Sequence, residues 1–592
     1  MWYYGFMPII LFFLFFLPTV LEGIGIRIYQ NLFFLLYYLI LPVPLYFYIL
    51  FTRTPLRLPR KIGVLFLLYL FLTNFSFFFA SANKQVSFEN LLTSLSFFLL
   101  FLFFYSLKDH FKKHALWLIM VLGLFFVVYS LCIPVFKYLH YSFLIPIHEK
   151  QTVLAIYGSH NHLGDFLGLV LLILLFSPIL KNRLAKSILS LVIFFSMVLA
   201  FSRSAYLAFF VILLLFFIQH RNRIGRKYLM LGFISLGLLI YLSFSVGSDN
   251  LSKKSSLYPL RQYAEKKLSI IPRDFLSGRD KFTLQALSSI RKNPLLGIGP
   301  GNFAVASMKY NTGPGNLFIT DSAHNIFLEV AVERGIPALI CFLLIVLFFL
   351  LQAVKRKDLY GYLFIYLLVN FQTDYTYQTY LFYLLFIMVA ATLYHEKEDY
   401  IIPSWVFGIF AITLFGFLTS ILTSAILFER GSYLAAINYY PYSKYAYLGA
   451  IQTTKDDALA QSLIERVDTI VPNDAGVAMV SGAYYLKTGR KVKALTMYEK
   501  AYRQNHLIAF PIMKQIYFLK KQVKSDKEAD QYLREIIGNL KYVFIPDSFK
   551  KEFGEFCLKA NEKICEETGW YKSAPKPLQK KIIKKTNNSV GK

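Results

Sequence analysis

Three side chains are suited to chemistry on a phosphate ester: Arg203 and His324, at the edges of apolar segments, and Arg279, in a long polar segment. A guanidinium presents a planar fork of N–H donors that matches phosphate oxygens, and partial removal from water strengthens that pairing. An imidazole titrates near neutral pH and can take a proton from a hydroxyl group. These residue types lead to the hypothesis of a site that holds a phosphate and activates an alcohol.

Each of the three also has a structural interpretation. Arg203 lies in the segment FSRSAY between two apolar spans, where an arginine that snorkels to the interface is common. His324 follows Asp321 and Ser322 at the expected start of a helix, and a lone histidine is more often structural than catalytic. The residues alone leave both interpretations open.

Arg279 lies in a long polar segment. Ser277 and Gly278 predict a helix start there, and Asn293–Pro294 predicts its end. The apolar residues of this amphipathic helix are Phe282, Leu284, Leu287 and Ile290. The simpler interpretation is a helix that lies on the bilayer surface, because the loop carries a net positive charge.

Two glycine-containing segments predict changes of direction. The run Gly297–Gly301 (GIGPG) lacks the spacing of a dinucleotide-binding fingerprint and predicts a tight reversal. Gly335-Ile336-Pro337 predicts a break between a short helix carrying Glu329 and Glu333 and the following span. His160, His162 and Asp165 lack the helical spacing or cysteine ligands of a metal site, so we predict no metal there.

The composition describes the elements that must hold these residues. Of 592 residues, 56% are hydrophobic and 16% are charged, against about 25% charged in a soluble domain. This excludes a water-soluble multi-domain enzyme, and apolar blocks of about 20 residues predict membrane-spanning helices. We predict an all-α polytopic protein with 12–14 spans, centred near residues 12, 41, 70, 99, 124, 171, 194, 211, 237, 342, 365, 385 and 415.

The Lys and Arg residues predict the orientation. The net charge of +29 indicates orientation and anionic lipid rather than nucleic acid. With the N-terminus in the cytoplasm, the inner loops hold eighteen Lys and Arg residues and the outer loops hold five. The expected regions are N-terminal spans (1–246), a large extracytoplasmic loop (247–323), C-terminal spans (324–428), an extracytoplasmic helical region (429–573) and a basic disordered tail (574–592).

The region 429–573 predicts helical hairpins of the tetratricopeptide-like kind. Its best repeat carries small or aromatic residues at the packing positions Gly482, Tyr485, Ala494, Tyr498 and Ala501. Such repeats commonly bind a protein partner. Cys557 and Cys565 could pair if this region faces an oxidising compartment.

Four segments, in order, resemble the bacterial O-antigen ligase family, which groups O-antigen ligases, O-antigen polymerases and protein O-oligosaccharyltransferases. Some members carry tetratricopeptide-like repeats at the C-terminus. The segments are YGSHNHLGDFL (157–167), FSRSAY (201–206), R-(x)11-RKNPLLGIGPGNF (279–303) and SAHNIFLEVAVERGIP (322–337).

The resemblance implies a GT-C-like enzyme of the bacterial inner membrane. It would move a glycan from a polyprenyl-diphosphate carrier to an acceptor hydroxyl at the outer face, with inversion and without metal or other cofactor. Arg203 and Arg279 would hold the diphosphate and His324 would activate the acceptor, with Asn161, Asn325 and Asp321 in support.

The acceptor stays open among lipid A–core, a protein hydroxyl and another glycan unit, the last being the polymerase alternative. A different class of function is a flippase for lipid-linked oligosaccharides, which should carry charged residues near the midplane of several spans. The predicted spans are nearly free of such residues, which favours chemistry at the interface. A non-catalytic scaffold is the third alternative.

The orientation can be tested by cysteine labelling in intact spheroplasts. Single cysteines introduced between residues 247 and 322 should react with a membrane-impermeant maleimide, because the inner loops hold most of the positive charge. A cysteine between residues 181 and 186 is the control, which should react only after the membrane is opened. Labelling of 247–322 only from the cytoplasmic side would contradict the predicted topology.

Overall fold

The computed structural model describes residues 40–138, 160–200, 202–220, 279–310, 320–394, 398–472, 474–504, 510–540 and 547–573, and these are almost entirely helical. Helices satisfy every backbone hydrogen bond within one segment, as hydrocarbon surroundings require. Six stretches are long and apolar enough to cross a membrane: Arg60–Ala80, Lys84–Asp109, Phe111–Ser130, Arg203–His220, Ile326–Arg356 and Ser404–Glu429. The protein is therefore an all-α polytopic membrane protein, as predicted.

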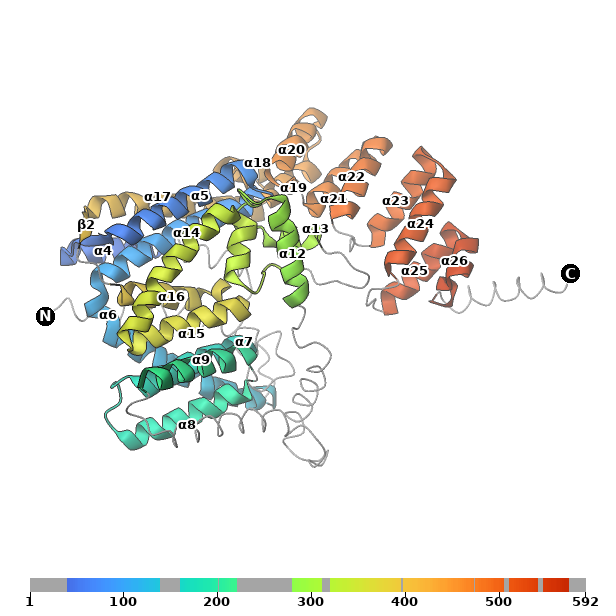
Figure 1. Ribbon diagram of the computed structural model, residues 1–592. Helices are drawn as coiled ribbons and strands as arrows, with labels where there is room; N and C mark the ends of the chain where they lie inside the picture. Colours follow the sequence, from blue (N-terminus) through green and yellow to red (C-terminus); the bar gives the residue numbers. More distant parts are fainter. Residues whose placement is uncertain are drawn as a thin grey trace, which may run out of the picture.

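The predicted spans within the described residues coincide with helices that pack into one bundle (Figure 1). The predicted centres near residues 12 and 237 lie outside the described residues. The bundle helices are α4 (Pro42–Thr52), α5 (Arg60–Ala80), α6 (Lys84–Tyr138), α7 (His160–Phe176), α8 (Arg183–Leu199), α9 (Arg203–His220), α14 (Ile326–Arg356), α15 (Leu359–Thr373), α16 (Tyr380–Leu393) and α17 (Ser404–Glu429).

The expected spans near residues 99 and 124 are confirmed as two membrane-crossing stretches, Lys84–Asp109 and Phe111–Ser130, which fall within α6. One feature of the bundle was not predicted. A short antiparallel pairing joins β1 (Leu56–Pro59) to β2 (Asp399–Ile402), and Arg60 Nη1 lies 2.9 Å from Glu398 Oε2 beside it. Strands of four residues next to prolines leave no periodicity from which they could be predicted.

Helix α14 is broken where the sequence predicted a break. Gly335 adopts φ 84° and ψ 171°, a conformation that only glycine adopts without strain. The break frees the carbonyl groups of Val332 and Glu333, which accept hydrogen bonds from Ile298 N (3.0 Å) and Gly299 N (2.9 Å). The loop after α12 (Arg279–Lys292) therefore replaces the missing helical hydrogen bonds.

The same loop makes the predicted tight reversal before α13 (Phe303–Lys309). Gly297, Gly299 and Gly301 all have positive φ. A Cβ atom on Gly297 would lie 2.4 Å from the carbonyl carbon of Glu333. Glycine is required here because the loop backbone lies directly against the broken helix.

Helix α12 confirms the predicted start and end, but its buried face differs from the expected one. Phe282 and Ala286 are buried, and Ala286 packs in a small core with Phe303 and Val332. Leu284 and Leu287 are exposed, although the sequence placed them on one apolar face with Phe282. The helix packs against α14 and α13, and its buried Gln285 accepts a 2.9 Å hydrogen bond from Ser307 Oγ of α13.

The C-terminal region is a row of helices that leads away from the bundle (Figure 1). Gly482 faces the ring of Tyr498 across a hairpin, and Tyr485, Ala494 and Ala501 are buried as predicted. The helices are α18 (Tyr433–Tyr439), α19 (Lys444–Thr453), α20 (Asp457–Ile470), α21 (Ala475–Lys487), α22 (Lys491–Gln504), α23 (Phe510–Val523), α24 (Asp526–Leu540), α25 (Asp547–Ala560) and α26 (Glu562–Thr568).

Helical hairpins are thus confirmed, while their membership of the tetratricopeptide family stays a prediction. The basic tail 574–592 lies outside the described residues. Tyr440 OH donates to Glu89 Oε1 (3.2 Å) and Lys444 N donates to Gln85 Oε1 (3.0 Å), so the start of this region is attached to α6.

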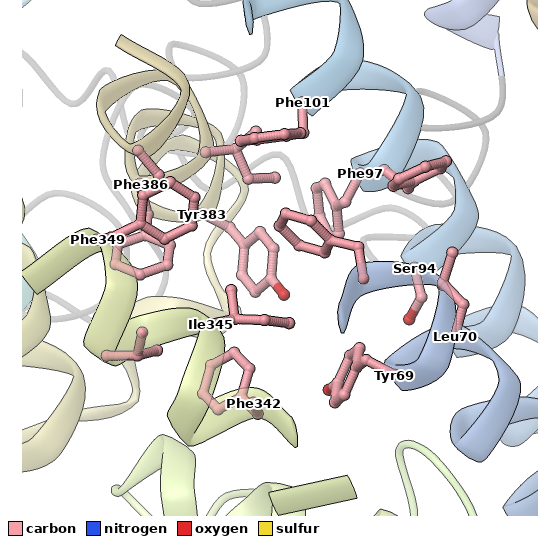
Figure 2. Close-up of a pocket in the computed structure, with 15 residues that line it drawn as sticks. Tyr69, Leu70, Ser94, Phe97, Phe101, Phe342, Ile345, Phe349, Tyr383 and Phe386 are labelled. Atoms are coloured by element: carbon pink, nitrogen blue, oxygen red, sulfur yellow. The ribbon is translucent and has the colours of Figure 1, made fainter. Parts of the chain in front are cut away.

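An apolar pocket lies inside the bundle between α5, α6, α14 and α16 (Figure 2). Aromatic rings form most of its wall, among them Phe97, Phe342 and Phe386. The Tyr69 and Tyr383 hydroxyls and Ser94 are the polar groups in its lining. This apolar lining suits a hydrocarbon chain rather than a charged ligand.

Gly335→Ala should destabilise the protein by at least about 2 kcal/mol, because a Cβ atom there would lie 2.1 Å from the Leu295 carbonyl oxygen at a strained backbone conformation. Thermal unfolding of the purified protein in detergent measures the effect. Gly416→Ala in α17 is the matched control, because nothing lies within 4 Å of the new methyl group. Equal melting temperatures for the two variants would contradict the proposed role of the break.

Candidate active site

A buried carboxylate, Asp374, joins the candidate residues. Arg279 Nη2 lies 3.5 Å from Asp374 Oδ2, and His324 Nδ1 lies 3.4 Å from Asp374 Oδ1. Asn161 Nδ2 donates a 2.8 Å hydrogen bond to Oδ2, and the backbone N–H of Tyr375 donates a 2.8 Å bond to Oδ1. Side chains from α7, α12 and the segment before α14 thus converge on the linker that follows α15.

His324 is held in an unusual backbone conformation. Its φ is 52°, in the left-handed region that costs a residue other than glycine about 1–2 kcal/mol. It does not start a helix, as the sequence analysis expected, because Asn325 is the N-cap of α14 and helix α14 begins at Ile326. The turn before the cap, rather than a helical register, sets the direction of the imidazole.

Glu329, in the first turn of helix α14, stabilises the backbone turn at His324. Its carboxylate accepts hydrogen bonds from Ser322 Oγ (3.0 Å), Ala323 N (3.0 Å) and Tyr377 OH (2.6 Å). Ser322 Oγ in turn accepts a 3.0 Å hydrogen bond from the backbone N–H of His324. Glu329 therefore links the segment that carries His324 to the short helix η3 (Tyr375–Gln378), which follows Asp374.

Aromatic rings enclose the His324 side chain. Phe282 stacks on it with ring centroids 5.0 Å apart, and Tyr375 meets it edge-on at 4.8 Å. His324 and Tyr375 also line an open hollow of about 550 Å³, together with Ala304, Thr320 and Asp321. The imidazole is thus packed on one side and borders a ligand-sized space on the other.

The cluster pairs one buried carboxylate with basic side chains. The side chain of Asp374 is 0% exposed, and those of Arg279 and His324 are 27% and 16% exposed. Burial alone would raise the pKa of Asp374, but its contacts with His324, His162 and Arg279 outweigh burial and lower the pKa to about 2. Asp374 is therefore ionised at neutral pH, and Arg279 Nε is a buried donor with no hydrogen-bond acceptor among the described residues.

The neighbours of Arg203 place it at the end of the bundle where the Asp374 cluster lies. Ser202 Oγ and Ser204 Oγ both donate to Asp165 Oδ1, at 2.9 and 2.7 Å, and so tie the start of α9 to α7. Asp165 lies one turn after Asn161, which contacts Asp374. Direct convergence on Asp374 is established for Arg279, His324 and Asn161, and Arg203 stands half-buried on the adjacent helix.

The other predicted residues have separate roles. Asn325 Oδ1 accepts from Phe327 N (3.0 Å) and Leu328 N (3.1 Å), so its side chain caps α14 instead of facing a substrate. Asp321 is exposed at the rim of the hollow. His162 packs against Tyr375, and no three His, Cys, Asp or Glu residues in the described part of the chain gather as a metal site.

Sequence reasoning missed Asp374 and underestimated Glu329. Asp374 lies in the linker NFQTDYTYQTY between α15 and α16, in which it is the only charged residue, and this isolation between two apolar spans is a signal that could have singled it out. Glu329 was noted only as one of two acids on a helix. Asn161 lies 213 positions from Asp374 and Tyr377 lies 48 positions from Glu329, so spacing along the chain could not reveal these contacts.

Residues 188–343 match the family model described as O-antigen ligase. This part of the chain is similar to that family. The matched residues include Arg203, Arg279, His324 and Glu329, whereas Asn161 and Asp374 lie outside them. The resemblance noted in the sequence is therefore confirmed for residues 188–343, and the match supports an O-antigen ligase or polymerase type of membrane glycosyltransferase family. No curated protein and no solved structure matches the chain.

Asp374→Asn should lower the stability of the helical bundle by about 1–3 kcal/mol at pH 7, because it removes a buried charge that two basic side chains contact. The pKa of Asp374 is lowered in the folded state, so its stabilising effect is complete above about pH 4 and is lost as the pH falls toward 2. The difference in melting temperature between wild type and variant should therefore shrink below pH 4.

Asp109→Asn is the control for this comparison, because that carboxylate is 79% exposed and pairs with Lys112 on the surface. It should change the stability by less than about 0.5 kcal/mol. An Asp374→Asn protein as stable as wild type at pH 7 would show that the carboxylate does not hold the cluster together.

Proposed function

We propose that this protein transfers a glycan from a polyprenyl-diphosphate carrier to an acceptor hydroxyl at the outer face of the bacterial inner membrane. The observation that supports the proposal is the convergence of Arg279, His324 and Asn161 on Asp374 beside an open hollow. A cationic group that holds an anionic leaving group and a base that takes a proton are the two requirements of this transfer.

In the proposed reaction, the acceptor oxygen forms a bond to the anomeric carbon of the glycan while the bond from that carbon to the diphosphate oxygen breaks. Attack opposite the leaving group inverts the anomeric centre. Negative charge grows on the diphosphate, where Arg279 and Arg203 stabilise it in a site of low dielectric. In this proposal the two guanidinium groups balance the diphosphate charge, so no step requires a metal or other cofactor.

The acceptor proton passes to His324. Its Nδ1 faces Asp374 at 3.4 Å, so Nε2 is the nitrogen left for the acceptor. The ionised Asp374 carboxylate stabilises the imidazolium that forms, as a buried acid does for a catalytic histidine. The left-handed turn at His324 and the Glu329 hydrogen bonds fix the direction of the ring.

The lipid part of the donor requires an apolar surface close to the spans. The pocket of Figure 2 supplies one, with a wall of aromatic and aliphatic side chains from α5, α6, α14 and α16. We propose that an isoprenoid segment of the carrier occupies it. Its few hydroxyl groups make it unsuited to the glycan itself.

Lipid A–core, a protein hydroxyl and a further glycan unit stay as acceptors within the proposal. The C-terminal hairpins favour a protein acceptor or partner, because stacked helical hairpins present a surface for polypeptide. A flippase would move the carrier without making a covalent product. The polar residues of the cluster lie at helix ends rather than at the midplane of the spans, which supports transfer over translocation.

Reconstitution in liposomes with a polyprenyl-diphosphate glycan and candidate acceptors tests the proposal. Arg279→Ala and Arg203→Ala should each reduce transfer by about 10²–10³-fold through loss of charge stabilisation. His324→Ala should reduce it by about 10²–10⁴-fold with donor binding retained, because the base acts on the acceptor. Product is measured as covalently linked glycan by gel shift and mass spectrometry.

Arg183→Ala is the charge-matched control, since Arg183 is exposed in a predicted cytoplasmic loop. It should leave transfer unchanged. Full transfer by folded Arg203→Ala, Arg279→Ala and His324→Ala proteins would refute the mechanism. Movement of the carrier across the bilayer without a covalent product would favour the flippase.

A further inference from the structure

Cys557 and Cys565 lie symmetrically on the two sides of a corner between helices. Helix α25 ends at Ala560, and Asn561 is the N-cap of α26. Asn561 N donates to the Cys557 carbonyl (2.9 Å), and Cys565 N donates to the Asn561 carbonyl (3.1 Å). Each cysteine therefore stands one turn from the corner, on helices that pack against each other.

Both cysteine side chains point into the same core. Each is 0% exposed, and they share a cluster with Phe553, Phe556 and Ile564. The Cys565 thiol, together with burial, raises the pKa of Cys557, which indicates that the two sulfur atoms are neighbours. Two neighbouring thiols on adjacent helices are the first requirement for a disulfide.

We propose that Cys557 and Cys565 form an intramolecular disulfide that fastens α26 to α25. The proposal rests on the outward orientation of the C-terminal region that belongs to the proposed function, because disulfides persist on the oxidising side of the membrane. The oxidant is a thiol–disulfide oxidoreductase of that compartment. Its S–S bond is reduced to two thiols while the two cysteine thiols lose two protons and two electrons and form the new S–S bond.

The bond would stabilise the end of the helical row. Helix α26 has seven residues, too few to be stable alone, and a terminal repeat lacks a neighbour on one side. The cross-link closes a loop of about nine residues and so reduces the freedom of the unfolded end of the chain. The disulfide is thus expected to hold the last hairpin in place for any partner of the row.

Counting thiols in the full-length wild-type protein tests the proposal. Membranes are quenched in acid, denatured and treated with maleimide-polyethylene glycol, with or without prior reduction. The chain has four cysteines, so two added polymers without reductant and four with reductant are expected. Cys557→Ser should then give three without reductant, because Cys132, Cys341 and Cys565 are all free. A pair between Cys132 and Cys341 would instead give one in that variant.

Four added polymers in unreduced wild type would overturn the disulfide. A separate variant then distinguishes this failure from a failure of the orientation: Thr488→Cys, at an exposed turn, in a chain with Cys557→Ser and Cys565→Ser. Labelling of Thr488→Cys by an impermeant maleimide from outside shows that the orientation holds and the disulfide alone is wrong. Labelling only after the membrane is opened shows that the orientation is wrong, and the disulfide with it.

Discussion

One buried anion, the Asp374 carboxylate, organises the end of the helical bundle at which the candidate site lies. A carboxylate with no exposed surface must be paired and hydrogen-bonded, since an isolated buried charge is strongly unfavourable. Asp374 obtains Arg279, His324 and Asn161 as partners from three parts of the chain that are far apart in sequence. Its presence therefore dictates that α7, α12 and the segment before α14 meet at the linker after α15.

The broken helix α14 makes that meeting possible. On the N-terminal side of Gly335 the helix carries Glu329, whose hydrogen bonds shape the turn at His324. On the C-terminal side the helix continues through the apolar bundle. The freed carbonyl groups of Val332 and Glu333 bind the glycine loop that follows α12, and so fix the helix on which Arg279 stands. The break thus positions both the base and the cationic group of the proposed reaction.

The first turns of α6 connect the C-terminal hairpins to the same loop. Ser87 Oγ donates to the Pro300 carbonyl (2.9 Å) and accepts from Asn302 Nδ2 (2.8 Å), while Gln85 and Glu89 bind the start of the hairpin region. The start of the hairpin region is therefore held close to the loop that supports Arg279.

The sequence singled out Arg203, Arg279 and His324 only as candidates, whereas it determined by itself the helical membrane bundle, the break at Gly335 and the glycine reversal. These follow from local causes: hydrocarbon requires apolar helices, and positive φ requires glycine. Only the tertiary structure decided that Asp374 is the common partner, that Glu329 sets the turn at His324 and that Asn325 serves as a cap. Contacts between side chains depend on how distant helices pack, and residue spacing along one chain carries no record of which helix lies beside which.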